Sequence, residues 1–324
     1  MTVTEENFAS LTAYWREDKY NLNWGSVFVL PAWLQVWWRT FGNGAHLSLL
    51  AVRQDGEIIG IAPLSIKGET ATFVGSADVC DYLDFIITPA RERDFFPALL
   101  DDLTGKGIRQ LDLAPLRPDS TVLTHLLPIA RERKYPVLCQ EDGVSVEMDL
   151  PATWDEYLAS LSVKQRHEVK RKLRRLGEVG DVAYHCIEVG QEVCDLTDTF
   201  LRLFVLSRTD KANFMTRQME SFFRALAEAM AEIGVLGFGI LRLDELPVAM
   251  IMRFDYNDTV YLYNSAFDPN FGSLSAGILS KVLCIKESIR RGRKKWDFLQ
   301  GRETYKYRLG GTGVSLSSCR IEIK

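Results

Sequence analysis

Side chains able to bind and activate a polar substrate gather in the segment QGRETYKYR, residues 300–308 of this 324-residue sequence. The segment follows a strand-like run, and a loop at a strand end can aim a lysine at a carboxylate, a phosphate or a developing oxyanion. We therefore predict catalytic roles for Tyr305 and Lys306, and substrate contacts for Arg302 and Glu303. The alternative is a solvated basic turn, because charged loops usually serve only as surface.

A second candidate is the acidic loop DVCDYLD at residues 78–84. Its carboxylates could accept a proton or bind an amine or sugar hydroxyls. We predict Asp81 or Asp84 as the general base and Tyr82 as a substrate contact. The alternative interpretation is an acidic turn that caps a strand.

A third candidate is the segment FDPNFGSLSAG, residues 267–277, between a strand-like run and a helix-like run. Unpaired amides and the dipole of a helix N-terminus can hold a phosphate or pyrophosphate. The predicted cofactor-binding residues are Gly272, Ser273, Ser275, Ala276 and Gly277. Alternatively, one of the serines only caps the helix. The spacing fits neither a Walker loop nor a dinucleotide fingerprint, which disfavours nucleotide hydrolysis and hydride transfer.

Composition excludes several classes of protein. A net charge of −4 gives no global attraction to nucleic acid or to an anionic membrane. The start is acidic and polar, and no run of about 18 apolar residues occurs, so we expect a cytoplasmic protein without a membrane span. The six cysteines and four histidines are scattered. We therefore expect reduced thiols and no metal site.

A basic run covers residues 164–175 and is interrupted by one acid, Glu168. Its cations could bind a phosphate backbone, tRNA included. A solvated helix face is the favoured reading, because no aromatic side chain lies between the charges to stack on bases.

The elements that would position these residues occur twice. Residues 54–61 align with residues 243–250, a displacement of 189 (from 55 to 244), and residues 107–113 align with residues 292–298. The second alignment places Asp297 on Asp112, and we interpret both as structural because one active site seldom needs the same group twice.

Each copy predicts a hairpin meander, a helix and one more strand. The expected elements are strands 47–53, 57–66, 70–75 and 109–114 with helix 90–106, and strands 235–243, 247–255, 259–266 and 296–299 with helix 276–291. A single amphipathic helix is expected at 154–177. We predict an α/β protein with domains 1–150 and 151–324, each a mixed, mostly antiparallel sheet flanked by helices.

The sequence from Tyr261 to Gly311 resembles the C-terminal part of the acetyltransferase domains in bacterial CelD-like and BioF2-like proteins. WDFLQGRETYKYRLG is its most diagnostic stretch, and SVKQRHEVKRKLRRLGEVG at residues 162–180 resembles the basic helix before the second unit. That family belongs to the GNAT superfamily and is related to the FemAB aminoacyltransferases.

The resemblance implies two tandem GNAT-like folds, with the donor site in the second. It implies that residues 272–277 hold the pyrophosphate of acyl-CoA, that splayed strands hold its pantetheine, and that Tyr305 and Lys306 lie near the cleft. FGSLSAG departs from the usual GNAT loop pattern Gln/Arg-x-x-Gly-x-Gly/Ala.

The leading hypothesis is N- or O-acyl transfer to a small-molecule or glycan acceptor. Such a reaction would fit envelope or polysaccharide metabolism. The alternatives are a FemX-like aminoacyl-tRNA-dependent transferase, with RNA on the 164–175 face, and a non-catalytic binding module on the same fold.

Overall fold

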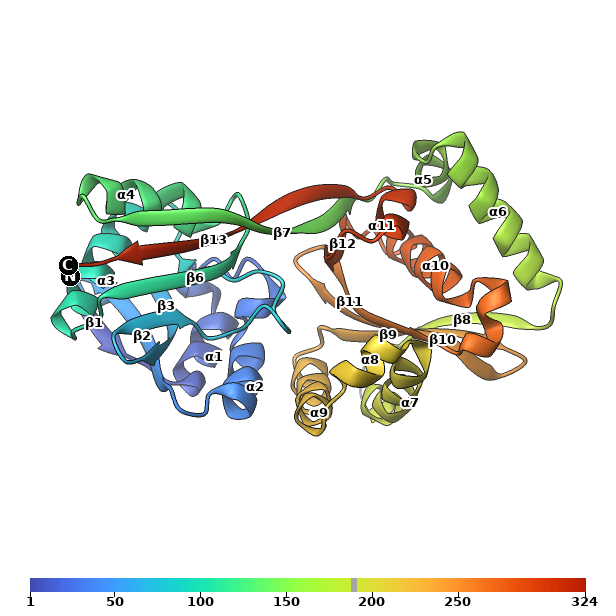
Figure 1. Ribbon diagram of the computed structural model, residues 1–324, viewed down its shortest axis with the longest axis horizontal. Helices are drawn as coiled ribbons and strands as arrows, with labels where there is room; N and C mark the ends of the chain where they lie inside the picture. Colours follow the sequence, from blue (N-terminus) through green and yellow to red (C-terminus); the bar gives the residue numbers. More distant parts are fainter. Residues whose placement is uncertain (188–190) are drawn as a thin grey trace. The chain divides into compact units, whose positions relative to one another are not determined.

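The computed structural model describes residues 1–187 and 191–324, which form two compact α/β units (Figure 1). Unit 1 comprises Met1–Val144 and Val314–Lys324, and unit 2 comprises Ser145–Gly313. Each unit has a mixed sheet with helices packed on it, which confirms the predicted α/β class. The division into domains 1–150 and 151–324 stays a prediction. The last strand of the chain belongs to unit 1.

Unit 1 is built around a sheet with strand order β1-β2-β3-β4-β6-β13-β7. Its strands are β1 (Thr2–Glu5), β2 (His46–Gln54), β3 (Glu57–Lys67), β4 (Thr70–Phe73), β5 (Ile86–Ile87), which pairs with β3, and β6 (Gln110–Leu116). Its helices include α1 (Phe8–Arg16), α2 (Pro31–Phe41), α3 (Glu92–Gly105) and α4 (Leu127–Glu132). Strands β7 (Val137–Asp149) and β13 (Thr312–Glu322) cross the boundary between the units.

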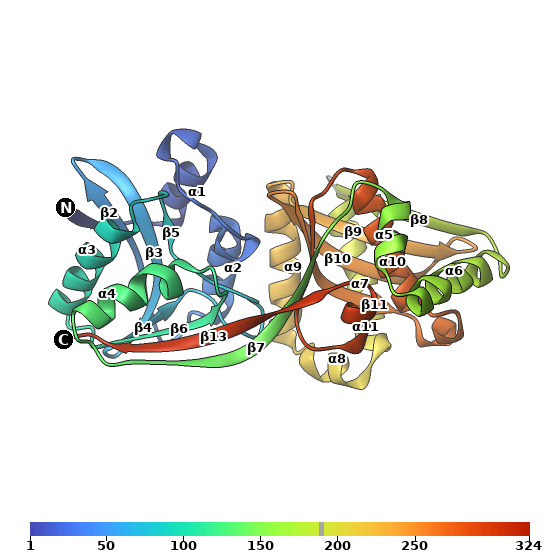
Figure 2. The same ribbon diagram turned by 90° about the horizontal axis from the view of Figure 1, so that it is seen from above.

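Unit 2 continues with strand order β7-β12-β11-β10-β9-β8. Its strands are β8 (Val182–Ile187), β9 (Leu236–Leu243), β10 (Leu246–Tyr256), β11 (Thr259–Phe267) and β12 (Lys295–Gln300). Its helices are α5 (Trp154–Ser160), α6 (Val163–Gly177), α7 (Gln191–Ser207), α8 (Thr209–Phe214), α9 (Arg217–Glu232), α10 (Ala276–Arg290) and α11 (Thr304–Arg308). Within this unit, α6 and α10 lie on one face of the sheet and α7 to α9 lie on the other (Figures 1 and 2).

The hairpins of both units form at turns whose residues tolerate the left-handed conformation. Asp55-Gly56 joins β2 to β3 with φ values of 52° and 86°, and Asn257-Asp258 joins β10 to β11 with 48° and 57°. Two consecutive positive φ values suit the twist of a tight hairpin. In each copy, the residues of the turn therefore favour the predicted antiparallel pairing of the two strands that they join.

Strand register supports the repeat. In unit 1, β4 and β6 pair in parallel from Thr70 with Gln110 to Thr72 with Asp112. In unit 2, β11 and β12 pair in parallel from Thr259 with Lys295 to Tyr261 with Asp297. Asp112 and Asp297 thus end equivalent parallel pairs, and each pair of strands separates beyond that point.

The expected single helix at 154–177 is wrong, because two helices cover this range. Leu161 is extended, with ψ of 148°, and Ser162 then caps α6 by accepting a hydrogen bond from the Gln165 amide. Serine followed three residues later by glutamine is a sequence signature of a helix start. The signal for two helices was therefore present at Ser162.

The expectation that all cysteines are reduced is also wrong, because Cys139 and Cys319 form a disulfide. These residues lie on β7 and β13, which are neighbours in the sheet of unit 1. Neighbouring strands bring side chains within bridging distance whatever their separation in sequence. The pairing could not be read from spacing, because β13 was not predicted. As for a membrane span, every helix within the described ranges is too short or too polar to cross a bilayer.

Candidate active site in unit 2

Strands β11 and β12 diverge in the middle of the unit 2 sheet, and α10 follows β11 at the diverging end. Side chains from the opposite layer bind the backbone of β11 where it leaves β12. The Ser207 hydroxyl accepts a hydrogen bond from the Phe267 amide at 2.7 Å, and the Lys211 ammonium donates to the Ser265 carbonyl. Helices α7 and α8 therefore fix the position of the strand end that leads into the glycine-serine segment.

The glycine-serine segment forms a 3₁₀ turn, Pro269–Leu274, followed by the first turn of α10. Ser275 has left-handed dihedrals (φ 60°, ψ 33°), and its side chain makes no capping hydrogen bond. The first amides of a helix have no intrahelical partner, so those of Ala276 and Gly277 can serve a ligand. The interpretation of Ser275 as a side-chain cap is thus excluded by its geometry.

Gly277 permits close packing at the start of α10. A Cβ atom there would lie 2.9 Å from the Phe267 ring, whereas one on Gly272 would meet no atom within 4 Å. Any side chain on Gly277 would therefore push α10 away from the end of β11. The predicted cofactor-binding residues, 272–277, lie together in this turn.

Lys306 is buried, with 2% of its surface exposed, and holds the end of β12. Its ammonium donates to the carbonyls of Leu299 at 3.0 Å and Gln300 at 2.7 Å and pairs with Glu303 at 3.1 Å. Leu299 has a positive φ of 62°, so this strand end is an irregular turn that needs such support. The geometry favours a positioning role for Lys306.

Asp297 supports the same turn from the other side. Its carboxylate accepts hydrogen bonds from the Leu299 amide at 2.8 Å and from the Ser145 hydroxyl at 3.3 Å. The side chain is buried. These contacts agree with the structural interpretation of this aspartate.

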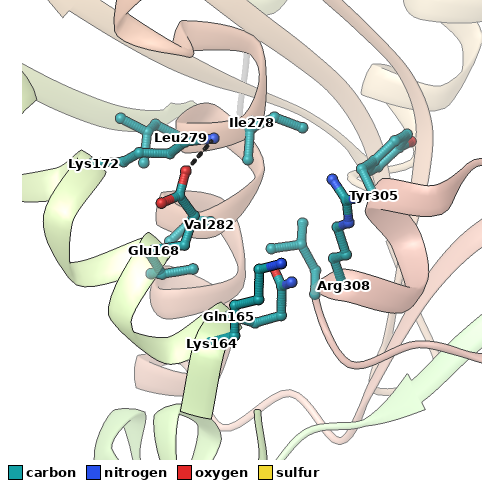
Figure 3. A pocket seen from close by; sticks show the side chains of 11 residues that line it. Lys164, Gln165, Glu168, Lys172, Ile278, Leu279, Val282, Tyr305 and Arg308 are labelled. Carbon is teal, nitrogen blue, oxygen red and sulfur yellow. Dashed lines mark ion pairs between the residues drawn. The ribbon is translucent and has the colours of Figure 1, made fainter. Parts of the chain in front are cut away.

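A cavity of about 340 Å³ lies between α6, α10 and α11 (Figure 3). Its lining residues are Lys164, Gln165, Glu168, Val169, Lys172, Ile278, Leu279, Val282, Tyr305, Arg308 and Leu309. Aliphatic side chains from α6 and α10 and from Leu309, just after α11, contribute apolar surface, and cations from α6 and α11 supply positive charge. Glu168 pairs with Lys172 at 3.3 Å. The cavity therefore suits an anion that carries an apolar portion.

Tyr305 connects this cavity with a group of buried cations. Lys281 of α10 is buried, donates to the Gly277 carbonyl at 2.8 Å, and places its ammonium 5.0 Å from the centre of the Tyr305 ring. Burial, with help from the nearby Lys211, lowers the pKa of Lys281 to about 7. Burial likewise lowers the pKa of Lys211 to about 8 and raises that of Tyr305 above its usual value. The tyrosine is therefore neutral at physiological pH, and its hydroxyl can donate a hydrogen bond.

The other predicted residues lie in unit 1. The carboxylate of Asp84 accepts hydrogen bonds from the Thr121 amide at 2.8 Å and hydroxyl at 2.6 Å, and from the Phe85 amide at 2.9 Å. Burial raises the pKa of Asp84 to about 6. Tyr82 is buried against the ring of Phe28, with the guanidinium carbon of Arg117 5.1 Å from its ring centre. These contacts are those of an anchored loop.

The same loop occupies the strand gap of unit 1. The Leu83 amide donates to the Pro115 carbonyl of β6 at 2.9 Å. The Leu83 side chain lies 2.5 Å from the position of a Cβ on Gly75, just beyond β4. The chain itself therefore bridges the ends of β4 and β6. Asp81, with Tyr82 and Asp84, belongs to this loop, so the predicted site residues form one group in each unit.

Several residues of the unit 2 site were not predicted. Lys281 lies among the buried residues Cys284 and Ile285 on the apolar face of its helix. A lysine among apolar residues on a helix face is unusual, and this pattern could have identified Lys281 as a candidate site residue. The cavity residues of α6 belong to the basic run, but their approach to α10 depends on tertiary packing. Within the described part of the chain, no group of histidine, cysteine or acidic side chains could hold a metal ion.

Comparison with known protein families gives a match, which lies in unit 2. The family described as acetyltransferase (GNAT) domain matches residues 163–307. This match identifies residues 163–307 of unit 2 as a GNAT domain. No curated protein matches the sequence of the chain.

Solved structures extend the GNAT fold to the whole chain. FemX has a TM-score of 0.66 at 13% identity, covering 98% of this chain and 97% of its own. The C-terminal domain of a putative lysylphosphatidylglycerol synthetase from Agrobacterium fabrum has a TM-score of 0.59 at 11% identity, covering 97% and 92%. A tandem GNAT protein from the clavulanic acid biosynthesis pathway has 0.53 at 11%, covering 99% and 98%. These matches confirm the tandem, FemAB-related type of GNAT fold.

Proposed function

We propose that this GNAT protein is an acyltransferase that moves an acyl group from a thioester, with acyl-CoA as the expected donor, to an amine or hydroxyl. The observation that carries the proposal is the divergence of β11 from β12 beside the free N-terminus of α10, next to a cavity with cationic and apolar walls. A polyanionic thioester needs both kinds of surface. In unit 1 the loop at residues 78–84 bridges the corresponding strand ends, so we place the donor in unit 2.

The donor would bind through groups already described. Amides of Ala276 and Gly277 would hold its pyrophosphate, and Lys164, Lys172 and Arg308 would add positive charge. Aliphatic side chains of the cavity, such as Val282, would contact the pantetheine. The acyl carbon would then be held in the strand gap, where binding energy is converted into orientation.

The reaction is a direct displacement. The acceptor nitrogen or oxygen attacks the thioester carbonyl, the C–S bond breaks as the tetrahedral intermediate collapses, and the thiolate takes a proton. That proton is the one that the acceptor loses, and the neutral Tyr305 hydroxyl would donate a hydrogen bond to the departing sulfur. Lys306 and Asp84 would position the strand end and the loop.

A titration of the purified protein with acetyl-CoA and longer acyl-CoA thioesters, followed by thermal unfolding, tests the donor. At about 100 times its dissociation constant, a ligand adds about 2.7 kcal/mol of stability. The double variant Lys164→Ala/Lys172→Ala should lose most of the shift. Its matched control, Lys170→Ala/Arg174→Ala, removes two exposed cations of the same helix that do not line the cavity and should keep it. Acceptors are then screened by release of free thiol, and absence of any shift argues against a thioester donor.

A second candidate is aminoacyl-tRNA-dependent transfer. The exposed cations of α6 and the fold similarity to FemX favour it. Binding of tRNA should then weaken steeply with salt, with a logarithmic slope of about −0.7 to −0.9 per phosphate contact. The Lys170→Ala/Arg174→Ala variant would reduce that slope. Absence of tRNA binding at low salt would exclude this candidate. If the protein binds neither acyl-CoA nor tRNA, a non-catalytic binding module becomes the favoured function.

A further inference from the structure

A pair of thiols meets at the edge of the unit 2 sheet, where β8 is the outermost strand. Cys186 of β8 lies opposite Gly239 of β9 in the antiparallel register. A Cβ on Gly239 would lie 3.6 Å from the sulfur of Cys284, which belongs to α10. The Tyr184 hydroxyl fills the space above Gly239, 2.1 Å from the same Cβ position, and both thiols lie around this hydroxyl and interact with each other.

The surroundings of this pair differ for the two sulfurs. Cys186 is half-buried, and its sulfur lies 3.9 Å from the Tyr184 hydroxyl. Cys284 is completely buried. The hydrogen bond from Cys284 and the charge of Arg253 lower the pKa of Cys186 to about 7. Burial raises the pKa of Cys284. One sulfur is therefore an accessible thiolate and the other a protonated neighbour.

Arg253 supplies fixed positive charge next to the pair. It lies on β10 with 1% of its surface exposed and pairs with Asp255, which also pairs with Arg293 at 3.1 Å. Thiolates at such electropositive, partly accessible positions are the ones that oxidants attack. Cys80 of unit 1 offers the contrast, since it is buried and its sulfur accepts from the Trp33 indole at 3.3 Å.

We propose that Cys186 and Cys284 form a peroxide-reactive dithiol in which Cys186 is the attacking thiolate and Cys284 the resolving thiol. The Cys186 sulfur attacks hydrogen peroxide, the O–O bond breaks, and a sulfenic acid and hydroxide form. The Cys284 sulfur then attacks the Cys186 sulfur, an S–S bond forms, the S–O bond breaks, and the thiol proton leaves with the oxygen as water. The two thiols lose two electrons and the peroxide gains them. This activity is independent of acyl transfer.

The test uses the full-length protein with Cys194→Ser, so that this thiol cannot compete. Treatment with hydrogen peroxide near stoichiometry at pH 7 should lower the mass by about 2 Da and yield a Cys186–Cys284 cross-linked peptide on digestion. Alkylation by iodoacetamide should modify Cys186 about tenfold faster or more than Cys80. Oxidation without the cross-link, or alkylation of Cys186 no faster than of Cys80, overturns the proposal.

Single variants separate the two roles. Cys284→Ser should stop at the sulfenic acid, which dimedone traps on Cys186, and Cys186→Ser should abolish the reaction with peroxide. Both are near-isosteric changes, and thermal unfolding verifies that each variant is folded. Equal peroxide consumption by Cys186→Ser and the parent would mean that another group reacts, which overturns the assignment of Cys186.

Discussion

The ammonium of Lys306 is bound to backbone carbonyls, and this changes what its substitution should do. Lys306→Met removes the donor shared by the Leu299 and Gln300 carbonyls. A buried acceptor left without its donor costs about 1–3 kcal/mol, so the free energy of unfolding in urea should fall by about that much, and acyl transfer should fall with it. Arg308→Met, an exposed cation on the same helix, should leave stability unchanged and weaken only donor binding. A stable but inactive Lys306→Met protein would restore the predicted catalytic role.

Lys281 should make the stability of the protein depend on pH. Its pKa is about 7 in the folded protein against 10.5 for an ordinary lysine. Between these values the unfolded chain binds the proton more tightly, so the free energy of unfolding should rise with pH from about 7 to about 10. Below pH 7 the destabilisation from this buried charge is complete. Lys211, Glu303, Lys306 and Cys284 also face this group.

Substitution of Lys281 isolates its contribution. Lys281→Met should raise stability at pH 6 by about 1–4 kcal/mol, as apolar replacements of buried charges often do, and the advantage should shrink toward pH 10. Lys286→Met, on the exposed side of the same helix, should show no such profile. Urea unfolding at several pH values measures both. A Lys281→Met curve parallel to that of the parent at every pH would contradict a charge buried in the folded state.

At the scale of elements, the two glycines before and within the first turn of α10 form a matched pair. Gly277→Ala places a methyl group 2.9 Å from the Phe267 ring, whereas Gly272→Ala meets nothing within 4 Å. Overpacking costs about 1–3 kcal/mol and should displace the helix start, so Gly277→Ala should weaken the thermal shift given by acyl-CoA much more than Gly272→Ala. Equal effects on donor binding would mean that the start of α10 does not hold the donor.

Elements with strong local signals were predictable from the sequence, and those that depend on partners were not. The hairpins at Asp55-Gly56 and Asn257-Asp258 and helix α10 follow from turn residues and periodicity. Strand β13 has weak alternation and is held by β6 and β7, which lie far away in sequence. For the site, the sequence singles out the segments at 272–277 and 300–308, whose roles stay predictions, but the cavity beside them requires α6 to pack on α10. The packing of one helix on another that is distant in sequence cannot be predicted from the spacing of residues within either helix.

At the scale of the whole molecule, the chain leaves unit 1 along β7 and returns along β13, so the first unit is completed only by the last residues. The returning strand contributes the buried side chains of Leu316 and Ile321, and Ile323 just after it is also buried. A protein ending at Gly313 lacks them and leaves the edges of β6 and β7 without their partner. We expect unit 1 of this variant to be digested by a protease within minutes while a fragment close to residues 145–313 survives.

Loss of the Cys139–Cys319 disulfide must be separated from loss of the strand in that experiment. The variant Cys139→Ser/Cys319→Ser keeps β13 and removes only the cross-link. It should unfold at a lower temperature than the parent yet resist the protease far longer than the truncated chain, because the buried apolar side chains of β13 remain in place. Equal protease resistance of the truncated and full-length chains would show that unit 1 closes without its C-terminal strand, and the discontinuous unit would then be wrong.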